Sequence, residues 1–253
     1  MSDQDTKSTA PPTAGAVIIG DEILSGQTRD ANIGYLGSWL AERGIPLAEV
    51  RVVSDEEAAI IEAVNSLRAR YDHVFTTGGI GPTHDDITAA AIARAFDVPL
   101  EENAEAAALL LGGRDRDGLR DARLRMAMMP VGAQLIENPV SRAPGFRLGN
   151  VYVMAGIPAV MQAMLESIAH LLGEGAPIRS RTITAIVAES RIARPLGDIQ
   201  KANGDVKIGS YPFFRPEATG TRLVLRATVP ARLDEVGALV RAMLLSLGAE
   251  IRD

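Results

Sequence analysis

The sequence contains no cysteine and few aromatic residues, and both absences limit what the protein can be. Without cysteine there can be no disulfide bridge, no thiolate metal ligand and no cysteine nucleophile. Aromatic residues make up 4% of the chain and hydrophobic residues of all types 47%, so the core must be built from Ala, Val, Ile, Leu and Met. A length of 253 residues fits one large domain, or one of about 150 residues with a smaller one.

Long apolar runs and basic stripes are missing as well. No uninterrupted hydrophobic run approaches the roughly 18–20 residues of a membrane-spanning helix, so no membrane partner is expected. The polar start of the chain, MSDQDTKSTAPPTAG, lacks the basic-then-apolar order of a secretion signal. We therefore expect a disordered tail at 1–13 and a cytoplasmic protein. The formal net charge is −6 and no Lys/Arg stripe with interleaved aromatics is evident, so nucleic acid is not an expected partner beyond a local patch.

Strand-like and helix-like segments alternate over residues 14–172. This order, with short connections, predicts an α/β domain with a largely parallel sheet that helices cover on both faces. The strands are expected at 14–20, 46–54, 71–79, 133–138, 145–149 and 150–156, and the helices at 29–44, 55–70, 86–97, 101–129 and 157–173.

A second domain is expected after the linker GEGAP at 173–177. Its segments follow the order βαββαβ, which is that of the ferredoxin-like split βαβ fold. We therefore expect a small α+β domain at 178–253. Its strands are predicted at 178–188, 206–214, 219–229 and 249–252, and its helices at 190–203 and 231–247.

The segment TTGGIGPTHDDIT, residues 76–88, places three glycines and two adjacent aspartates directly after an expected strand. Ligands of open α/β sheets bind beyond the carboxyl ends of the strands, which is where this segment falls. Gly78, Gly79 and Gly81 allow a ligand to approach the backbone closely, and the following helix offers free N–H groups to a phosphate. The segment is not a Walker A loop, because the chain has no Gly-Lys-Ser/Thr.

The two aspartates complicate a phosphate site. Asp85 and Asp86 would repel a phosphate by roughly 4 kcal/mol per pair of unit charges at about 4 Å and an effective dielectric near 20. A divalent cation reverses that sign, and Mg²⁺ commonly binds one or two carboxylates together with substrate phosphates. This interpretation makes both residues metal ligands. The alternative is that Asp85 caps the following helix, Asp86 complements its dipole and the glycines only form a turn.

Further polar residues are expected near the same turn. Thr83 is a candidate nucleotide contact, and His84 is a candidate for phosphate contact or acid–base catalysis. Asp21 and Glu22 follow the first strand and Asp55 follows the second, so these acids should converge on the same edge of the sheet. Taken singly, Asp55 also suits the first turn of a helix, and Asp21 and Glu22 suit a turn.

Two later loops add candidates for phosphate contact. NPVSRAPGF, residues 138–146, presents Ser141 and Arg142 between two prolines, and arginine is well shaped for bidentate contact with phosphate. A solvated loop arginine is the alternative. AGIPAVM, residues 155–161, supplies Gly156 in another strand-to-helix turn.

The segment IGSYPFF in the second domain brings Tyr211, Phe213 and Phe214 close together. We expect these aromatics to serve domain packing or a dimer contact.

These stretches make the chain similar to the Mog/MoaB superfamily, the "probable molybdopterin-binding" domain of molybdenum-cofactor biosynthesis. The resemblance covers residues 14–172 and rests on TTGGIGPTHDDIT, GDEILSGQTRDAN, NPVSRAPGF and VYVMAGIPAVM. The GGxGPTxDDxT turn most resembles the competence/damage-inducible CinA type. The second domain, with ESRIARPLGDIQ and KIGSYPFF, resembles the small domain that follows in CinA-type proteins. A similar arrangement occurs before the adenylyltransferase part of some eukaryotic FAD synthases.

The resemblance implies a three-layer Mog/MoaB-like domain and one of two activities. Mog-type members adenylylate molybdopterin with Mg-ATP, whereas CinA-type members are metal-dependent pyrophosphatases of ADP-ribose, and FAD-synthase relatives act on FAD. By position in the motif, Asp86 matches the Mog-type aspartate and Asp55 the acid after the second strand. Asp85 is acidic in the CinA-type pattern, where Mog-type members usually carry a basic residue. Relatives are commonly oligomeric, so a homo-oligomer is expected.

Two departures from the CinA-type pattern are visible. Val160 stands where such chains often carry an acid, which weakens the transfer of the full hydrolase constellation. The sequence also ends at Asp253 without the nicotinamide-mononucleotide deamidase domain of full CinA proteins, so that activity is not expected.

The leading hypothesis is therefore a nucleotide pyrophosphatase that depends on Mg²⁺ or another divalent metal and acts on ADP-ribose, FAD or a similar dinucleotide. Asp55, Asp85 and Asp86 are its expected catalytic residues. One alternative is a molybdopterin-binding or molybdopterin adenylyltransferase protein, with molybdopterin as ligand. The other is a catalytically idle protein that binds a nucleotide or pterin.

Overall fold

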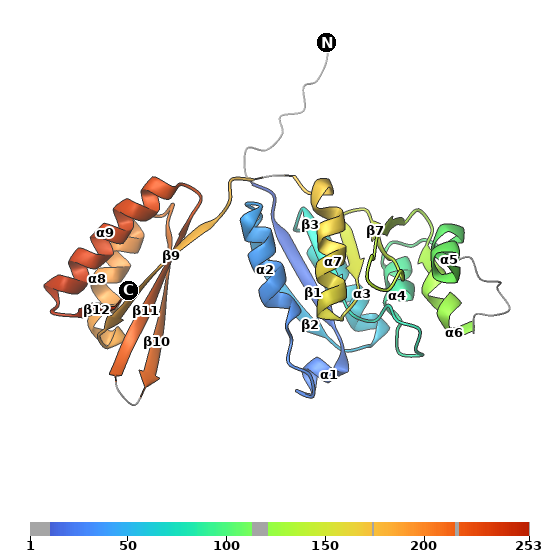
Figure 1. Cartoon of the computed structure of the whole chain (residues 1–253), viewed down its shortest axis with the longest axis horizontal. Coiled ribbons are helices and arrows are strands. Elements are labelled where there is room, and N and C mark those ends of the chain that lie inside the picture. Colours follow the sequence, from blue (N-terminus) through green and yellow to red (C-terminus); the bar gives the residue numbers. More distant parts are fainter. Residues whose placement is uncertain (1–10, 113–120, 174, 216–217, 253) are drawn as a thin grey trace, which may run out of the picture. The chain divides into compact units, whose positions relative to one another are not determined.

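The computed structural model describes residues 11–112, 121–173, 175–215 and 218–252. The chain divides into two compact units, with the boundary between Gly175 and Ala176 (Figure 1). Among the described helices, none is both long enough and apolar enough to cross a membrane.

A six-stranded sheet forms the centre of the first unit, in the order β2-β1-β3-β8-β7-β6. The first four strands in this order run parallel, whereas β7 is antiparallel to β8 and β6 to β7. The predicted mostly parallel sheet is therefore confirmed. The strands are β1 (Ala14–Ile19), β2 (Leu47–Val53), β3 (His73–Thr77), β6 (Gln134–Ile136), β7 (Gly145–Leu148) and β8 (Val151–Met154).

Helices cover both faces of this sheet, so the unit has three layers (Figure 1). Successive side chains of a strand point to opposite faces, and Ala16 and Val17 of β1 accordingly belong to different cores. One core contains residues of α3, α4 and α5, and the other residues of α2 and α7. These helices are α2 (Asn32–Glu42), α3 (Glu57–Arg68), α4 (Thr88–Ala95), α5 (Ala104–Leu111) and α7 (Pro158–Ile168). A short 3₁₀ turn, η3 (Ala169–Leu171), follows α7.

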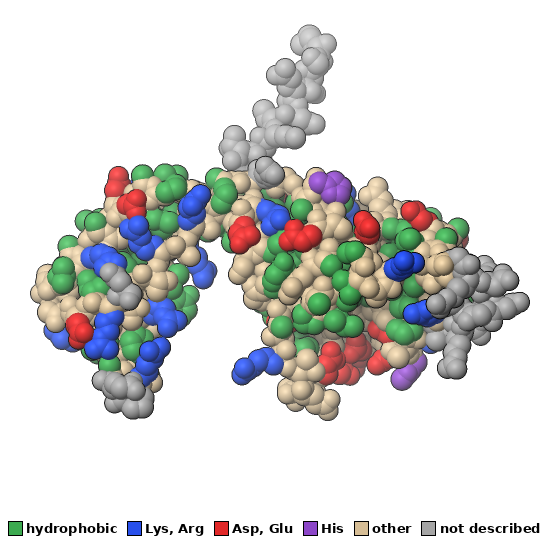
Figure 2. Space-filling model, in the orientation of Figure 1, with side chains coloured by type: hydrophobic (Ala, Val, Ile, Leu, Met, Phe, Trp, Pro, Cys, Tyr) green, Lys and Arg blue, Asp and Glu red, His purple; other side chains and the backbone are tan. Residues whose placement is uncertain are grey.

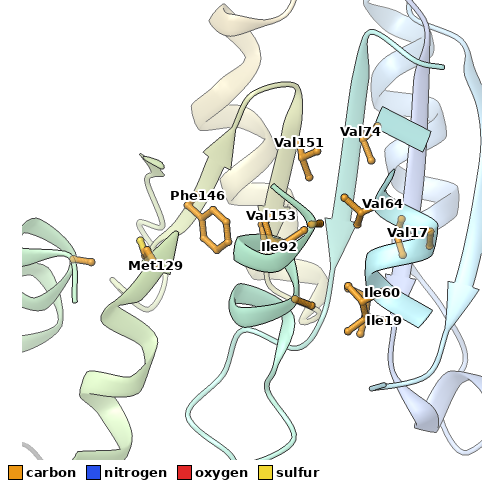
Figure 3. Packing of buried hydrophobic residues seen from close by; sticks show 14 of the residues in the cluster. Val17, Ile19, Ile60, Val64, Val74, Ile92, Met129, Phe146, Val151 and Val153 are labelled. Carbon is orange, nitrogen blue, oxygen red and sulfur yellow. The ribbon is translucent and has the colours of Figure 1, made fainter. Parts of the chain in front are cut away.

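The core on the α3 and α4 side is largely aliphatic. Val64 of α3 lies beside Val17 of β1 and Val74 of β3, and Ile60 of the same helix lies beside Ile19 (Figure 3). Phe146, near Met129, is the fully packed aromatic of this core (Figure 3). This agrees with a sequence rich in Ala, Val, Ile, Leu and Met but poor in aromatic residues.

The expectation that residues 101–129 are wholly helical was wrong. Part of it, 113–120, lies outside the described residues. The described part contains two short antiparallel strands, which pair with each other across more than twenty residues of sequence. Such non-local pairing leaves no local periodicity from which to predict it. The elements are β4 (Leu100–Glu102), α5, α6 (Asp121–Leu124), the 3₁₀ turn η2 (Arg125–Ala127) and β5 (Met128–Pro130).

The predicted disordered tail at 1–13 lies mostly outside the described residues, which begin at residue 11. Thr13, however, is attached to the first unit. Its backbone N–H and its hydroxyl both donate to Asp72 Oδ2, at 2.7 and 2.9 Å. This residue therefore belongs to the folded unit.

The second unit is a four-stranded antiparallel sheet in the order β10-β11-β9-β12. The order β-α-β-β-α-β along the chain, with the first and third strands at the centre, confirms the predicted ferredoxin-like arrangement. Helices α8 and α9 share a hydrophobic core with one face of the sheet. The elements are β9 (Arg179–Ile186), α8 (Glu189–Ala202), β10 (Lys207–Arg215), β11 (Ala218–Ala227), α9 (Pro230–Ser246) and β12 (Glu250–Arg252).

We predict that Phe75→Ala destabilises the first unit by about 3–5 kcal/mol, because a fully buried aromatic leaves a cavity when it is truncated. Phe75 stacks on Tyr152 with ring centroids 5.1 Å apart, so the change also removes a ring contact. Denaturant unfolding followed by circular dichroism measures the loss. Val131→Ala, at an exposed valine, is the control and should change stability by less than about 0.5 kcal/mol. Similar losses in both variants would contradict this assignment of the core.

Candidate functional site

A cavity of about 840 Å³ opens beyond the carboxyl ends of β1, β3 and β8. Figure 2 shows acidic side chains gathered at this end of the first unit, beside α1 (Asp21–Leu24). Of the residues predicted from the sequence, Asp21, Thr83 and His84 do not line the cavity. Those that do are Glu22, Asp55, Gly78, Gly79, Gly81, Asp85, Asp86, Ser141, Arg142, Gly156 and Val160.

The turn after β3 requires glycine at two positions. Gly78 has φ +106°, and a Cβ there would lie 2.1 Å from the carbonyl oxygen of Ile19. Gly79 has φ +66°, and a Cβ there would lie 2.2 Å from Thr88 Oγ1. The Thr88 hydroxyl donates to the Gly78 carbonyl at 3.0 Å and its N–H donates to the Gly79 carbonyl at 3.0 Å. Close packing against β1 and α4 therefore fixes the path of this turn.

The turn keeps donors for a ligand. Within the described residues, no hydrogen bond uses the backbone N–H of Gly79, Ile80 or Gly81. These groups lie in a turn that lines the cavity, where backbone N–H groups suit phosphate oxygens. The glycines consequently serve the fold and leave backbone donors beside the cavity.

Helix capping does not explain the two aspartates. The N-cap position of α4 is Ile87, no side chain caps the helix, and its first turn contains no acid. The alternative in which Asp85 caps α4 and Asp86 complements its dipole is therefore wrong. The turn places both residues upstream of the helix, on the cavity wall.

Asp86 closes its own turn. Its Oδ2 accepts a hydrogen bond from the Thr83 N–H at 2.8 Å and another from the Thr83 hydroxyl. The same oxygen would lie 2.6 Å from a Cβ at position 81, so Gly81 is needed for this closure. Thr83 thus acts within the turn by holding Asp86.

Asp85 is the more available carboxylate of the pair. Its side chain is 63% exposed and lies 3.9 Å from His84 Nδ1. The pKa of Asp85 lies below its usual value, with the neighbouring Thr83 side chain as the first cause and the backbone N–H of Asp85 itself as the second, although the Thr83 hydroxyl donates its proton to Asp86. Asp85 is therefore ionised at neutral pH. The side chain of His84 is 93% exposed and lies outside the cavity lining, so its structural position favours a solvated residue.

The pKa of Asp55 is affected by burial and by the other acids at this edge of the sheet. Burial raises the pKa of Asp55 first of all, and the charges of Asp21, Glu22 and Asp85 raise it further. A hydrogen bond from the Asp21 N–H to Asp55 Oδ2, at 2.9 Å, acts in the opposite direction. Acids from three segments that are far apart in sequence thus lie close enough to repel one another.

A short helix that the sequence did not predict positions the acids after β1. Residues Asp21–Leu24 form α1, where only a turn was expected. A Cβ at Gly20 would lie 2.6 Å from Glu22 Oε1, so the glycine lets the Glu22 carboxylate fold back toward the end of β1. Glu22 lines the cavity, whereas Asp21 contributes through its backbone N–H and its charge.

Asn138 organises the loop that carries Ser141 and Arg142, and sequence reasoning missed it. Its Oδ1 accepts from the backbone N–H of Val140 and Ser141, and its Nδ2 donates to Ser141 Oγ at 2.6 Å and to the Ala143 carbonyl at 2.8 Å. Arg142 has φ +65°, a strained value for a residue with a side chain. The Asn-Pro start of the loop was the signal, since asparagine commonly bonds its own following backbone.

A second asparagine that the sequence analysis missed joins two strand ends. Asn32 is 5% exposed, and its Nδ2 donates to the Gly156 carbonyl at 2.8 Å and to Thr77 Oγ1 at 3.4 Å. A Cβ at Gly156 would lie 3.3 Å from Gly78 Cα, so the two glycine turns touch. Asn32 thereby holds the turn after β8 against the turn after β3.

Much of the rest of the cavity is apolar, although Thr28 and Arg123 also line it. Leu109 of α5, Ile157 before α7 and Val160 of α7 line it, and the first two are exposed to solvent. Val160 is nearly buried and packs into the core on the α2 and α7 side. The cavity therefore combines a carboxylate-rich part with hydrophobic side chains that can contact a flat ring.

The carboxylates suit a hard cation that is shared with a ligand. Within the described residues, no group of three or more His, Asp or Glu side chains is arranged to hold a metal ion. A closed cage made only of protein ligands is therefore not present in that part of the chain. Mg²⁺ commonly binds one or two carboxylates and completes its shell with water and substrate phosphates, and the mutual repulsion at Asp55 is what such an ion relieves.

A family model described as "Probable molybdopterin binding domain" matches residues 15–174. The chain belongs to this family. A second model, described as "FAD synthase, middle domain", matches residues 177–249. Both matches agree with the resemblance inferred from the glycine–aspartate turn and from the second domain.

Relatives of this family member include CinA-type proteins. The chain is similar to the solved structure of CinA from Thermoplasma acidophilum, whose function is described as unknown, at 32% identity and a TM-score of 0.59. That match covers 64% of this chain and 99% of the other. A CinA-like protein from Citrifermentans bemidjiense is 35% identical over 93% of this chain, which spans 59% of that relative's length. A protein from Pyrobaculum calidifontis is 32% identical, and the match covers 92% of this chain and 93% of that one.

We predict that Asp55→Asn raises the melting temperature at pH 7 by about 2 °C when divalent cations are removed with EDTA. The raised pKa of Asp55 means that the folded state prefers the protonated carboxyl. The penalty is absent below the ordinary aspartate pKa of about 3.9 and develops as pH rises through the folded-state pKa. The stability gain should therefore vanish in acid. Thermal scans between pH 3.5 and 8 measure it.

Asp72→Asn is the matched control, with the opposite sign. The Thr13 N–H and hydroxyl lower the pKa of Asp72, so its ionised form stabilises the fold above the ordinary pKa and loses this effect as pH falls through the folded-state pKa. This variant should lower the melting temperature at pH 7. A melting temperature that falls in both variants at pH 7 would contradict the penalty that burial and the neighbouring charges are said to impose on ionised Asp55.

Proposed function

We propose that the first unit hydrolyses the pyrophosphate bond of a nucleotide such as ADP-ribose or FAD, with the help of Mg²⁺ or another divalent cation. The observation that carries this proposal is the lining of one cavity by four carboxylates, a turn with backbone donors and two arginines, Arg123 and Arg142. Carboxylates alone would repel a diphosphate, and the donors alone would not need four acids nearby. A cation and a diphosphate together account for both.

The divalent cation would be held by Asp55 and Asp85, with Glu22 beside them. Asp85 is ionised at neutral pH and exposed, so its carboxylate is available to an incoming ion. Burial is the main cause of the raised pKa of Asp55, and the charges of neighbouring acids add to it, so a positive charge would stabilise the ionised carboxylate. When bound, the cation would neutralise the diphosphate and lower the pKa of water near it.

The chain's own donors would orient the diphosphate. The N–H groups of Gly79 and Gly81 can donate to phosphate oxygens, and Arg142 can make a bidentate contact from the opposite loop. Ser141 Oγ is fixed by its hydrogen bond from Asn138, so its hydroxyl can donate to a ligand. The loop is pre-shaped by Asn138, which lowers the entropic cost of binding.

The apolar part of the cavity would accept the flat ring of the substrate. Leu109 and Ile157 are exposed hydrophobic residues on its lining, and they are positioned to cover an adenine, a flavin or a pterin ring. Shared recognition of phosphate says little about what lies beyond it, so this surface is where the choice of substrate would be made.

A second candidate is adenylyl transfer to molybdopterin, and it is favoured by the family description "Probable molybdopterin binding domain". Asp85 argues against it, because the resemblance places a basic residue there in Mog-type members. Val160, at a position where CinA-type chains often carry an acid, favours the third candidate, a protein that binds a nucleotide or pterin without turnover. Its side chain is nearly buried and brings no charge to the cavity.

One product analysis separates the three. The purified protein is incubated with ADP-ribose, with FAD, or with ATP and molybdopterin, each with a series of divalent cations, and the products are identified by mass spectrometry. Release of AMP from ADP-ribose or FAD is the expected result. Transfer of AMP to the pterin would support the second candidate, and binding without any product the third.

We predict that Asp55→Asn and Asp85→Asn each lower kcat/KM for the pyrophosphate substrate by about 100-fold or more, because each removes a charge that stabilises the bound cation. Both substitutions keep the size and the hydrogen-bonding oxygen of the side chain. The control is Glu101→Gln, which neutralises an exposed carboxylate of β4 that does not line the cavity. Activity equal to that of the control in both variants would overturn the assignment.

Asp86 should respond differently to two substitutions. Asp86→Ala should remove most turnover with the fold intact, since it deletes the oxygen that accepts both Thr83 hydrogen bonds. Asp86→Asn keeps an acceptor oxygen and should therefore retain clearly more activity than the alanine variant. Steady-state kinetics with circular dichroism as a folding check measures both. Equal loss in the two variants would show that Asp86 acts through its charge rather than through the turn.

A further inference from the structure

The sheet of the second unit has one face that no described helix covers. Its other face shares a core with α8 and α9, through Ile183 of β9 and Leu223 and Leu225 of β11. Side chains alternate along a strand, so the neighbours of these residues point to the opposite side. That opposite side is exposed or half-buried along most of its length.

This face collects cationic residues from three strands. In the register of the sheet, Lys207 lies opposite Arg226, and Tyr211 lies opposite Arg222. Thr184 of β9 pairs with Arg222 on one side and with Arg252 on the other. Each of these cations is exposed. We call this surface the basic sheet face; it comprises Lys207, Tyr211, Phe213, Arg215, Arg222, Arg226 and Arg252.

Most of these charges are not neutralised by the described part of the protein. Within that part, Lys207, Arg215, Arg222 and Arg226 form no ion pair, whereas Arg252 pairs with Glu250 at 2.9 Å. Figure 2 shows blue Lys and Arg side chains gathered over the strands of this unit.

The charge of the chain is divided unevenly between its two parts. The sequence from 176 to 253 contains 12 Lys and Arg against 8 Asp and Glu, a net charge of +4. Residues 1–175 contain 14 against 24, a net charge of −10. Such an asymmetry between the halves of a chain is typical of proteins with a polyanionic partner.

Two aromatic rings lie among these cations. A Cβ at Gly209 would lie 2.8 Å from the ring of Tyr211, and a Cβ at Gly220 would lie 2.6 Å from the ring of Phe213. Each ring therefore lies over a glycine on the sheet surface. Tyr211 is 49% exposed, and the guanidinium carbon of Arg215 lies 5.3 Å from the centre of the Phe213 ring.

The face is also hollowed beside Phe213. A pocket of about 250 Å³ is lined by Thr184, Ile186, Phe213 and the three arginines at positions 215, 222 and 252. Arginine presents a planar fork of donors that matches phosphate, and it also stacks on flat rings. The pocket thus offers phosphate contacts next to an aromatic surface.

We propose that the basic sheet face binds single-stranded nucleic acid. Its arginines contact the phosphate backbone, and unpaired bases stack on Tyr211 and Phe213. Lys207 and Arg215 are eight residues apart on β10, which at about 3.3 Å per residue is roughly 26 Å, so one small phosphate compound cannot reach both. Duplexes keep their bases stacked inside, and an anionic membrane offers no unpaired base to exposed rings. A polymer of several unpaired nucleotides uses both the charges and the rings.

The experiment measures binding of the full chain to fluorescein-labelled 12-nucleotide oligo(U) and oligo(dT) by fluorescence anisotropy, at 50 and 200 mM salt. Binding should weaken as salt rises, because each neutralised phosphate contributes a slope of about −0.7 in log K against log salt for single strands. The double variant Arg222→Glu/Arg226→Glu should lose at least tenfold in affinity. The control Arg194→Glu makes the same type of charge change on α8 and should stay within twofold of the wild type.

The ring contribution is tested separately. Tyr211→Ala should lower affinity for the oligonucleotide by about tenfold, which is the size expected for one lost stacked base, and Tyr211→Phe should bind like the wild type. Heparin, a polyanion without bases, should bind the Tyr211→Ala variant and the wild type equally. Thermal melts check folding, and Arg222→Gln/Arg226→Gln replaces the double glutamate variant if that variant does not fold.

Several results would overturn the proposal. These are no binding at 50 mM salt, equal binding of a duplex of the same length, or equal losses in the Arg194→Glu control. Binding of phosphatidylserine vesicles without binding of oligonucleotide would assign the face to a membrane instead. Unchanged affinity in Tyr211→Ala would reduce the face to a non-specific polyanion patch and would refute the role of single strands.

Discussion

The structure of the first unit depends on carboxylates that are forced together at one edge of its sheet. The carboxyl ends of parallel strands lie at the same edge of a sheet, so the acids that follow β1, β2 and β3 lie close together. Gly78 packs within contact distance of Ile19 and of Gly156, which draws the strand ends still closer. Burial raises the pKa of Asp55 first of all, and the charges of Asp21, Glu22 and Asp85 raise it further. A fold that keeps such repulsion without a partner loses stability, and a bound cation with a diphosphate turns the same arrangement into attraction.

The neighbouring residues Asp85 and Asp86 have different roles at this edge, because the hydrogen bonds of Thr83 are made to Asp86. Thr83 donates to Asp86 through its backbone and its hydroxyl, which commits one oxygen of Asp86 to the turn. Asp85 remains exposed beside Asp55 and Glu22. In the proposed hydrolysis the two residues would act for separate reasons: Asp86 through the shape of the turn and Asp85 through its charge. Adjacent identical letters in a sequence therefore do not imply a shared role.

Local patterns in the sequence predicted the parallel sheet, the ferredoxin-like second unit and the glycine–aspartate turn, because alternation and turn chemistry are local properties. What depended on distant residues was missed. The β4–β5 pair joins Leu100 to Pro130, and Asn32 reaches Gly156 across the sheet edge. Capping of α4 by Asp85 was a reasonable alternative that failed because the helix begins later, at Thr88. The convergence of the acids followed from topology, whereas the turn-closing role of Asp86 needed side-chain positions.

The basic sheet face escaped a search for charge stripes for a similar reason. Its residues occupy alternate positions of a strand, and its cations are at least four residues apart and come from three strands, so in the linear sequence they are separated by core and uncharged residues. A net charge of −6 also conceals the opposite signs of the two parts. These signs separate the ligands that each part can accept. The net positive charge of the second unit attracts a polyanion, whereas the acidic cavity of the first unit repels it. A diphosphate can bind in that cavity only together with a cation. A chain with both proposed sites would bind two kinds of phosphate compound without either competing for the other's site.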